Sequence, residues 1–367
     1  MSEKNKKYSR RDFFKIAGAA GIGSAAASVG SIAGAAAPKG SSDAGLQVVP
    51  KRPFGKTGEH VSMLSFGGSQ NLESKLLLLK QAFKLGVTYW DTAEIYSGGR
   101  SEIAMGKYFQ KFPEDRKKIF LVSKANTSEP PELSRSLDQS LERLQTDYLD
   151  LYFIHMVDNV EKQLTQRVKA WAEKAKSQGK IRFFGFSTHK NMESSLIEGA
   201  KLGWIDGIMT TYNYRLMNTD DMKRATEACI KAGIGLTAMK TQAKFFARFY
   251  ADIGSMGGAE TLSDRFLKKG FTPEQAKLKA VWENPGIASI CSEMPNMTIL
   301  QANAAAAMDK TELSSQDRKL LENYARASSF GYCAGCAKLC DAAVGDSVPV
   351  SDIMRYLMYH DEYDSQQ

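Results

Sequence analysis

The sequence predicts an α/β fold, a (β/α)8 TIM barrel with a C-terminal helical extension that contains cysteines. Three observations support this prediction. Short apolar segments alternate with segments of helical periodicity between residues 61 and 308, which favours parallel strands joined by helical crossovers. There are eight such pairs, and that number fits a closed barrel. No Gly-x-Gly-x-x-Gly follows the first strand, which disfavours the alternative of an open doubly wound sheet.

The expected elements follow one another in a regular order. Strands are expected at residues 61–68, 87–92, 119–125, 148–157, 181–187, 208–213, 234–240 and 287–292. Helices are expected at residues 74–85, 101–110, 131–144, 161–177, 192–202, 220–231, 273–282 and 298–308. The periodicity is clearest in the third helix, where Leu133, Leu137, Leu141 and Leu144 share one face. In a barrel of this kind the active residues lie at the C-terminal ends of the strands.

The composition is typical of a soluble globular protein, with 43% hydrophobic and 25% charged residues. The formal net charge of the 367 residues is +8. Residues 1–15 hold six basic and two acidic side chains, so they contribute +4 (6 − 2) and the rest of the chain is only mildly basic. Because no basic stripe interleaved with aromatic residues is present, we do not expect a nucleic-acid partner.

The first 37 residues have the pattern of an export signal. The pair Arg10-Arg11 is followed by Phe13-Phe14-Lys15 and then by an Ala/Gly-rich stretch, which resembles a signal of the twin-arginine type. An amphipathic helix or an uncleaved anchor is the alternative. The stretch lacks the roughly 20 strongly apolar residues of a membrane span, so no stable span is expected after cleavage.

This pattern predicts four parts of the chain. Residues 1–37 are expected to be the signal peptide, with cleavage favoured after Ala35, and residues 38–50 a linker. Residues 51–310 are expected to form the barrel, and residues 311–367 the C-terminal helical extension. The protein is then expected outside the cytoplasmic membrane, in the periplasm, with the twin-arginine export machinery as a partner.

Polar side chains stand at the ends of three expected strands. They are Asp91, Lys124 and His155, and Tyr96 follows Asp91 by five residues. A Lys and an Asp that face inward on neighbouring strands are costly to leave unpaired, so they are expected to pair. A lysine ammonium beside Tyr96 favours the phenolate, and we expect it to lower a pKa that starts near about 10. Such a tyrosine can donate a proton to a carbonyl oxygen and take it back in the reverse reaction.

These four residues resemble, in order and spacing, the catalytic tetrad of the aldo-keto reductase family. The segments 52–58, 61–68 and 91–96, with Ser101-Glu102, also resemble family motifs, and the resemblance covers residues 51–310. It implies hydride transfer between a nicotinamide nucleotide, NAD(P)(H), and a small-molecule carbonyl compound or sugar, or oxidation of the corresponding alcohol. It also implies that Tyr96 is the acid/base, that Lys124 tunes it, that Asp91 holds Lys124 and that His155 orients the substrate.

The resemblance also implies a set of cofactor contacts. The candidates are Gly67, Gly68, Asp91, Ser187, Thr188, Tyr212, Met239, Lys240 and Asn303. Three positions depart from the family pattern: Thr188 replaces an Asn, Met209 a Gln, and Glu293 lies close to an expected Lys. Between residues 285 and 308 there is no basic residue for a 2′-phosphate, so either NAD(H) is preferred or the inserted segment 241–271 supplies a cation.

The C-terminal extension contains the run Cys333-Ala-Gly-Cys336-Ala-Lys-Leu-Cys340. It resembles the ferredoxin-like run Cys-x2-Cys-x2-Cys-x3-Cys-Pro that ends some bacterial members of the family. The third Cys is one residue late and the fourth is absent, whereas a four-iron cluster usually takes four thiolates. A metal site at Cys333, Cys336 and Cys340 is therefore less favoured than a disulfide or a structural relic.

Three functions are compatible with these motifs. The leading one is an oxidoreductase of the aldo-keto reductase type, whose nicotinamide cofactor we expect to be tightly bound, because the twin-arginine route exports folded, loaded proteins. The alternatives are a non-catalytic nucleotide-binding sensor and an electron-transfer enzyme linked to an iron–sulfur cluster. The complete tetrad argues against the sensor, and the incomplete cysteine run argues against the electron-transfer enzyme.

Overall fold

Parallel strands close into a barrel in the order β10-β3-β4-β5-β6-β7-β8-β9, as the sequence predicts. The computed structural model describes residues 47–242, 272–327 and 332–363. The strands are β3 (Leu64–Gly67), β4 (Tyr89–Asp91), β5 (Phe120–Ala125), β6 (Leu149–Ile154), β7 (Ile181–Thr188), β8 (Gly207–Thr211), β9 (Gly235–Met239) and β10 (Ile287–Glu293). An antiparallel hairpin of β1 (Lys51–Pro53) and β2 (His60–Ser62) precedes them.

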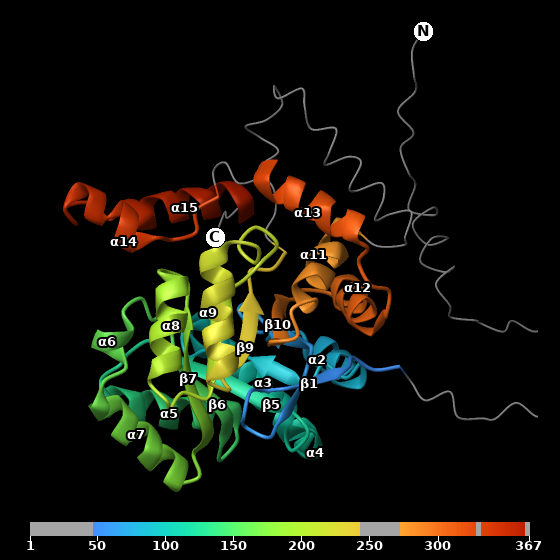
Figure 1. Cartoon of the computed structure of the whole chain (residues 1–367). Helices are drawn as coiled ribbons and strands as arrows, with labels where there is room; N and C mark the ends of the chain where they lie inside the picture. The colour runs from blue at the N-terminus through green and yellow to red at the C-terminus, as the bar shows by residue number, and fades with distance from the viewer. Residues whose placement is uncertain (1–46, 243–271, 328–331, 364–367) are drawn as a thin grey trace, which may run out of the picture.

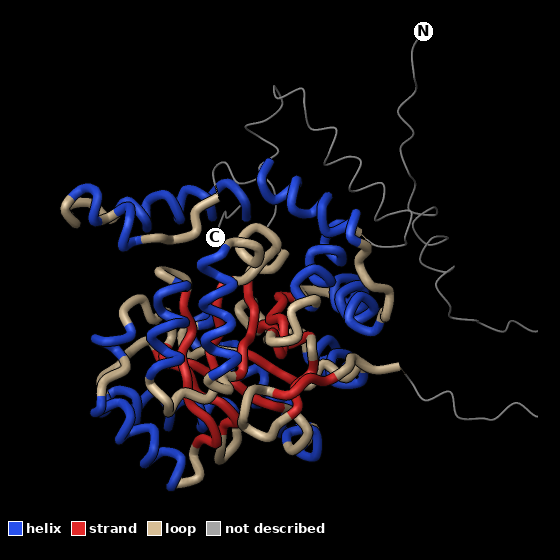
Figure 2. The backbone as a smooth tube through the Cα atoms, viewed as in Figure 1, coloured by secondary structure: helices blue, strands red, loops and turns tan. Residues whose placement is uncertain are grey.

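Helices surround the strands, so that the sheet forms the inner layer (Figures 1 and 2). They are α2 (Leu76–Lys84), α3 (Arg100–Lys111), α4 (Pro113–Arg116), α5 (Pro130–Leu144), α6 (Val160–Gln163), α7 (Gln166–Ser177), α8 (Met192–Lys201), α9 (Asp220–Lys231), α11 (Pro273–Trp282) and α12 (Met297–Met308). No helix in the described part of the chain is long and apolar enough to cross a bilayer.

Two expected elements are each divided in the structure. The expected strand 61–68 is interrupted at Met63, because β2 pairs with the hairpin strand β1 while β3 pairs with its barrel neighbours. The expected helix 161–177 is divided into α6 and α7. Thr165 has an extended backbone, and its side chain accepts a hydrogen bond from Val168 N, so it caps a new helix instead of continuing the first.

Apolar side chains fill the barrel from the end at which the strands begin. Phe54 closes this end, and its ring centroid lies 6.2 Å from that of Tyr89 and 5.4 Å from that of Phe120. Gly235 makes room for it, because a Cβ there would lie 2.5 Å from the Phe54 ring. This end of the barrel is therefore packed solid, and the opposite end is free to carry the site.

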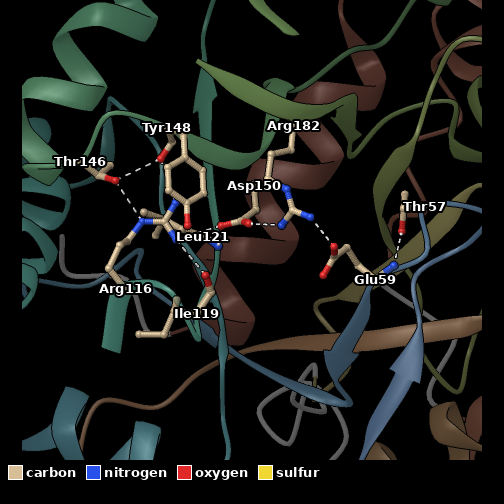
Figure 3. A network of polar contacts seen from close by, with 9 residues as sticks. All are labelled: Thr57, Glu59, Arg116, Ile119, Leu121, Thr146, Tyr148, Asp150 and Arg182. Atoms are coloured by element: carbon tan, nitrogen blue, oxygen red, sulfur yellow. Dashed lines mark hydrogen bonds and ion pairs between the residues drawn. The ribbon is translucent and has the colours of Figure 1, made fainter. Parts of the chain in front are cut away.

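Figure 3 shows a polar network on the same closed end. Asp150 Oδ2 accepts from Arg116 Nη1 at 3.0 Å and from the backbone N–H of Leu121 at 2.9 Å. Asp150 Oδ1 accepts from Arg182 at 2.7 Å, and Arg182 also pairs with Glu59 of the hairpin. Because every charge in this chain of contacts has a partner, the network ties the hairpin to the barrel and needs no ligand.

The C-terminal extension lies across the open end of the barrel (Figure 1). It comprises α13 (Ser315–Ala327), α14 (Ala337–Cys340), the 3-10 turn η2 (Ala342–Val344) and α15 (Val350–Tyr363). It is held to the loops that follow β7 and β8 by contacts that include Lys190 to Asp352 at 2.7 Å, Asn191 N to Gly335 O at 2.9 Å, and Asn213 to the Tyr332 hydroxyl at 2.9 Å. The expected signal peptide, most of the linker and most of the inserted segment lie outside the described residues.

Candidate active site

The candidate catalytic side chains continue the inward-facing rows of the barrel. Tyr89, Val122 and Phe153 belong to its interior cluster. Asp91, Lys124 and His155 stand two residues further along the same strands or just beyond them. Since side chains alternate along a strand, a step of two keeps them on the inner face. The period of the strands thus places all three at the open end.

Lys124 and Asp91 form a buried ion pair, as expected from their positions on neighbouring strands. Lys124 Nζ lies 2.6 Å from Asp91 Oδ1, and the two side chains are 0% and 2% exposed. The ammonium group also donates to the carbonyl oxygen of Thr92 at 2.7 Å. Burial lowers the pKa of Lys124, but the charges of Asp91 and Tyr96 and the hydrogen bond to Asp91 together more than offset it, so that pKa lies above its usual range and the lysine stays charged.

Tyr96 meets this pair from the loop after β4. It begins the 3-10 turn η1 (Tyr96–Gly99), in which Ser97 has a positive φ of 51°. The Tyr96 hydroxyl accepts from Lys124 Nζ at 3.4 Å, and Nζ lies 4.8 Å from the ring centroid. The ring meets that of His155 edge-on, with 5.7 Å between centroids. All four tetrad residues are therefore in one cluster.

Lys124 lowers the pKa of Tyr96, as expected, but the pKa does not fall overall. Burial raises the pKa of Tyr96 to about 12, and the neighbouring ammonium of Lys124 offsets only part of that increase. The sequence indicates the attractive charge but does not reveal how far the residues packed around the Tyr96 hydroxyl shield it from water. Near neutral pH, Tyr96 is therefore a phenol with a proton to give.

His155 is neutral at physiological pH. Burial and the charge of Lys124 lower its pKa to about 3. Its Nδ1 is buried without a hydrogen-bond partner in the described structure. Placing the proton on Nε2 leaves only a lone pair, and not an N–H group, buried without a partner. This tautomer makes His155 a hydrogen-bond donor of the kind that can orient a carbonyl oxygen.

Two residues at the start of α3 form hydrogen bonds around the Lys124–Asp91 ion pair. Ser101 Oγ donates to Gly68 O at 2.6 Å and lies 2.8 Å from Thr92 Oγ1, so it joins the ends of β3 and β4. Glu102 is fully buried, accepts from Ser123 at 2.6 Å and pairs with Arg143 at 3.2 Å. These bonds fix the backbone around Thr92 and Lys124, and with it the position of the ammonium group.

This arrangement matches a family of known proteins. The family model described as "Aldo/keto reductase family" matches residues 62–322, which is more than half of the chain. The chain belongs to the aldo/keto reductase family. The aldo-keto reductase yakc of Schizosaccharomyces pombe, which is named for NADP(+), is 30% identical over 155 residues, covering 39% of this chain and 44% of that protein. The chain thus aligns with less than half the length of this relative.

Solved aldo-keto reductases share the fold. A thermostable member in complex with the inhibitor epalrestat is 28% identical, with a TM-score of 0.60 over 75% of this chain and 99% of that one. A member from Bacillus halodurans in its holo form is 21% identical, with a TM-score of 0.61 over 75% and 96% of the two chains. At 21% identity the second likeness concerns the fold alone.

The candidate cofactor residues of this aldo/keto reductase begin with two glycines at the end of β3. A Cβ on Gly67 would lie 3.0 Å from Ser292 O, and one on Gly68 would lie 2.7 Å from Asp91 O. Gly68 N also donates to Asp91 O at 2.8 Å. The close approach of these backbones explains both glycines structurally and brings them directly against the tetrad.

Ser187 and Thr188 end β7 beside His155. Ser187 Oγ accepts from Met156 N at 3.0 Å, so it joins the end of β7 to the loop after β6. Thr188 Oγ1 donates to Lys190 O at 2.9 Å. Ser187 is thus close to the tetrad, while the hydroxyl of Thr188 is engaged within its own loop.

Tyr212, Met239 and Lys240 occupy three different environments. The Tyr212 side chain lies in the apolar cluster of strands and helices, and its hydroxyl accepts from Asn284 at 3.0 Å. Met239 belongs to the interior cluster, at the open end of the barrel. Lys240 has a positive φ of 55°, and its Nζ lies 3.7 Å from the ring centroid of Tyr359 in α15. Of the three, Met239 is the side chain that faces the interior with the tetrad.

Asn303 lies apart from the tetrad in a small uncharged cluster. Its Nδ2 donates to Ser292 Oγ at 3.0 Å, and its Oδ1 accepts from Gln242 at 3.2 Å. Ser292 Oγ in turn donates to Gln242 Oε1 at 2.9 Å. The exposed Glu293 follows at the end of β10. These groups offer amides and hydroxyls but no positive charge.

The cysteines carry no metal site in the described structure. Cys333, Cys336 and Cys340 are all free thiols. Among the described residues, no group of three or more His, Cys, Asp or Glu side chains is placed to hold a metal ion. Cys333 instead packs against α15, where its backbone N–H donates to Met358 Sδ at 3.1 Å.

The motifs did not indicate two residues near the open end. His189 follows Ser187 by two and therefore shares its inward phase; its ring centroid lies 6.5 Å from that of His155. Arg355 is a buried cation on α15. The strand period could have indicated His189, but no local pattern links it to Arg355, which lies far along the sequence.

Proposed function

We propose that this protein is a nicotinamide-nucleotide-dependent oxidoreductase that reduces an aldehyde, ketone or sugar carbonyl, or oxidises the corresponding alcohol. One observation carries the proposal: Lys124 Nζ contacts both Asp91 and the Tyr96 hydroxyl, with the His155 ring against Tyr96, at the open end of the barrel. Membership of the family and the NADP(+) in the name of the yakc relative support the same reaction.

The residues at this end fit a nicotinamide nucleotide. Met239 offers an apolar surface for a ring, and Ser187 offers a hydroxyl for a carboxamide beside His155. The uncharged cluster of Ser292, Gln242 and Asn303 suits an adenosine. When bound, the nucleotide supplies or accepts the hydride.

The chain's own residues handle the proton and the geometry. Tyr96 donates its phenolic proton to the carbonyl oxygen during reduction and recovers it during oxidation. Lys124 stabilises the phenolate that results, because its charge is fixed 3.4 Å from the hydroxyl oxygen. His155, neutral at pH 7, donates a hydrogen bond that orients the carbonyl. Asp91 keeps Lys124 in place and compensates its charge.

The polar groups around the adenosine end favour NAD(H). A 2′-phosphate is doubly charged and needs cationic partners. Residues 285–308 contain no Lys or Arg, and Glu293 adds a negative charge there. A cation from the inserted segment 241–271, of which residues 243–271 lie outside the described residues, is the alternative source of an NADP(H) site.

Substitution of Tyr96 by Phe tests the catalytic assignment. The variant should lose carbonyl reduction by about 10²–10⁴-fold, because the proton donor is removed, while nucleotide binding stays near normal. Tyr148→Phe is the matched control, since that ring stacks on Arg116 at the closed end of the barrel. Wild-type turnover by Y96F, with nucleotide bound normally, would overturn the assignment of Tyr96.

We also propose that the protein is exported by the twin-arginine route and works outside the cytoplasmic membrane. Arg10-Arg11 followed by Phe13-Phe14-Lys15 and an Ala/Gly-rich stretch supports this proposal. Replacing the arginine pair by Lys-Lys should stop export, because this route reads the pair itself, whereas Lys6→Arg should leave it intact. Fractionation that finds undiminished export of the Lys-Lys variant would point to another route.

A further inference from the structure

Arg355 is a buried cation without an ion-pair partner among the described residues. It is 6% exposed, and its Nε is buried without a hydrogen-bond partner. Within the described structure it forms no ion pair. Placing a charge out of water without a counter-charge is costly, and natural proteins keep such a group where a ligand supplies the counter-charge.

The fold directs Arg355 toward the barrel. Ser351, Arg355 and Met358 are the buried positions of α15 and recur at the spacing of one helical face, whereas Met354 and Tyr356 are exposed. That buried face lies over the loops after β7 and β8, to which the extension is bonded. Arg355 is therefore on the side of the helix that faces the open end.

The cysteine-containing turn has a cradle for this guanidinium. Gly335 has a φ of +74°, and a Cβ there would come within 1.3 Å of Arg355 Nη2 and 2.9 Å of His189 O. Only glycine leaves the space in which the guanidinium lies, between the turn and the end of β7. This packing gives a structural reason for Gly335 inside the run Cys333–Cys336.

His189 connects Arg355 to the catalytic cluster. Its ring centroid is 6.5 Å from that of His155, whose ring meets Tyr96 at 5.7 Å. The Nδ1 of His189 is buried and, like Arg355 Nε, has no partner in the described structure. Burial, and then the charges of Lys240, His155 and Arg355, lower the pKa of His189, so the ring is neutral and can offer a hydrogen bond without adding charge.

Three acidic side chains of α15, of the turn before it and of the tetrad are engaged elsewhere. Asp352, on the same helix, pairs with Lys190 at 2.7 Å. Asp341 accepts from Ser351 Oγ at 2.8 Å, and Asp91 is paired with Lys124. The positive charge of Arg355 is therefore not cancelled by these carboxylates.

We propose that Arg355 and His189 bind a carboxylate on the substrate, so that the reaction acts on carbonyl compounds that carry an acid group several bonds away from the carbonyl. The inference rests on the proposed function, in which His155 and Tyr96 bind the carbonyl end of the substrate. A guanidinium binds a carboxylate through two parallel hydrogen bonds, and it would bind a phosphate by the same chemistry. The rings of Tyr96, His155 and His189 lie one after another between the carbonyl site and Arg355. The substrate is therefore expected to be extended, and a 2-oxo acid, whose two groups are adjacent, would not fit.

The test compares ω-oxo carboxylates of increasing chain length, each with its carboxamide, on the full mature protein. The wild type should prefer one chain length of carboxylate over its amide by about 10- to 100-fold in kcat/KM, since a charge-assisted pair is lost in the amide. Arg355→Met should abolish the preference by raising KM for the acids far more than KM for the amides, and Arg355→Lys should retain part of it. Matched ω-oxo phosphate esters distinguish the two anions: faster turnover of the phosphates would replace carboxylate by phosphate in the proposal.

Lys338→Met is the control, because that lysine belongs to the same extension but pairs with Glu198 of α8 at 3.1 Å. Calorimetric binding of glutarate and adipate, which have no aldehyde or ketone group to reduce, separates this inference from the catalytic one. Binding that R355M loses supports the anion site even if no aldehyde turns over. Three results would overturn the proposed carboxylate site: equal rates for acids and amides, no binding of the dicarboxylates, or an effect of R355M on the KM for the nucleotide alone. A lower melting temperature of R355M, with all substrates affected equally, would make Arg355 a structural residue.

Discussion

Lys124 and Asp91 neutralise each other inside the barrel, with 2.6 Å between Nζ and Oδ1 and almost no exposure to solvent. Asp91 Oδ2 has no hydrogen-bond partner in the described structure, so Lys124 is the principal group that compensates the carboxylate. A buried pair of this kind contributes little net stability as a unit, but removing one partner leaves the other charge stranded. Single and double variants of this pair can therefore separate its effect on stability from its effect on activity.

Asp91→Asn should lower the free energy of unfolding by about 3–5 kcal/mol, because Lys124 keeps a buried charge without a counter-charge. Asp91→Asn combined with Lys124→Met should recover most of that loss, since no charge remains. Neither variant should reduce carbonyl compounds at the wild-type rate. Denaturant unfolding of the two single variants and the double variant measures the coupling, and additive losses in stability would contradict the pairing.

The low pKa of His155, about 3, predicts a loss of stability in mild acid. In the unfolded chain a histidine titrates near about 6.5, so between these values the unfolded state binds more protons and the free energy of unfolding falls as the pH falls. At pH 5 the cost is about 2 kcal/mol. His155→Asn should remove this part of the pH dependence.

Denaturant unfolding at pH 7 and pH 5 checks this prediction. The difference in the free energy of unfolding between the two pH values should be smaller in H155N than in the wild type. His60→Asn is the control, because His60 is exposed on the hairpin at the other end of the barrel. The same pH dependence in H155N and the wild type would show that His155 is not held neutral by burial.

The sequence predicted the barrel and the inward positions of Asp91 and Lys124 because these follow from local periods, whereas Tyr96, on a loop, was assigned through the resemblance to the family. A step of two residues along a strand keeps Asp91 in the row of Tyr89 and Lys124 in the row of Val122, whatever the rest of the chain does. The raised pKa of Tyr96 did not follow, because desolvation depends on everything packed above the site. The helix boundary at Thr165 was missed because a single capping hydrogen bond divides an otherwise continuous periodicity.

The contacts of the C-terminal extension could not be predicted from local sequence patterns, because they join residues that lie far apart in the sequence. Gly335, His189 and Arg355 meet only because α15 folds back over the loop after β7. Read alone, the turn around Gly335 resembles a damaged ferredoxin motif. In the structure it is also the surface on which Arg355 lies, so a structural role accounts for its glycine without a metal.

The cysteine run should not hold a stable four-iron cluster. Three thiols are available at Cys333, Cys336 and Cys340, whereas a cubane usually takes four. Iron and sulfide analysis of anaerobically prepared protein should find less than one cluster per chain. Ser351→Cys, which adds a fourth thiol near Cys333, is the comparison, since Cys333 Sγ lies 3.7 Å from Ser351 O. About four iron and four sulfide per wild-type chain would refute the prediction.

A nicotinamide nucleotide should copurify with the protein and cycle without leaving it. Such nucleotides are not expected free outside the cytoplasm, while the proposed export signal is of the kind that carries folded, loaded proteins. The C-terminal extension supports retention, because Tyr332 bonds Asn213 at 2.9 Å and the Tyr359 ring covers Lys240 at 3.7 Å, both at the open end of the barrel. A cover that opens slowly holds its ligand, and one substrate would then be oxidised and another reduced on the same nucleotide in a ping-pong cycle.

Denaturing the desalted protein should release about one nucleotide per chain, with NAD(H) at least as abundant as NADP(H) because residues 285–308 hold no cation for a 2′-phosphate. Tyr359→Ala should speed its release without changing the tetrad. An empty protein that follows ordered kinetics with millimolar added nucleotide would contradict retention and would favour a working site in the cytoplasm.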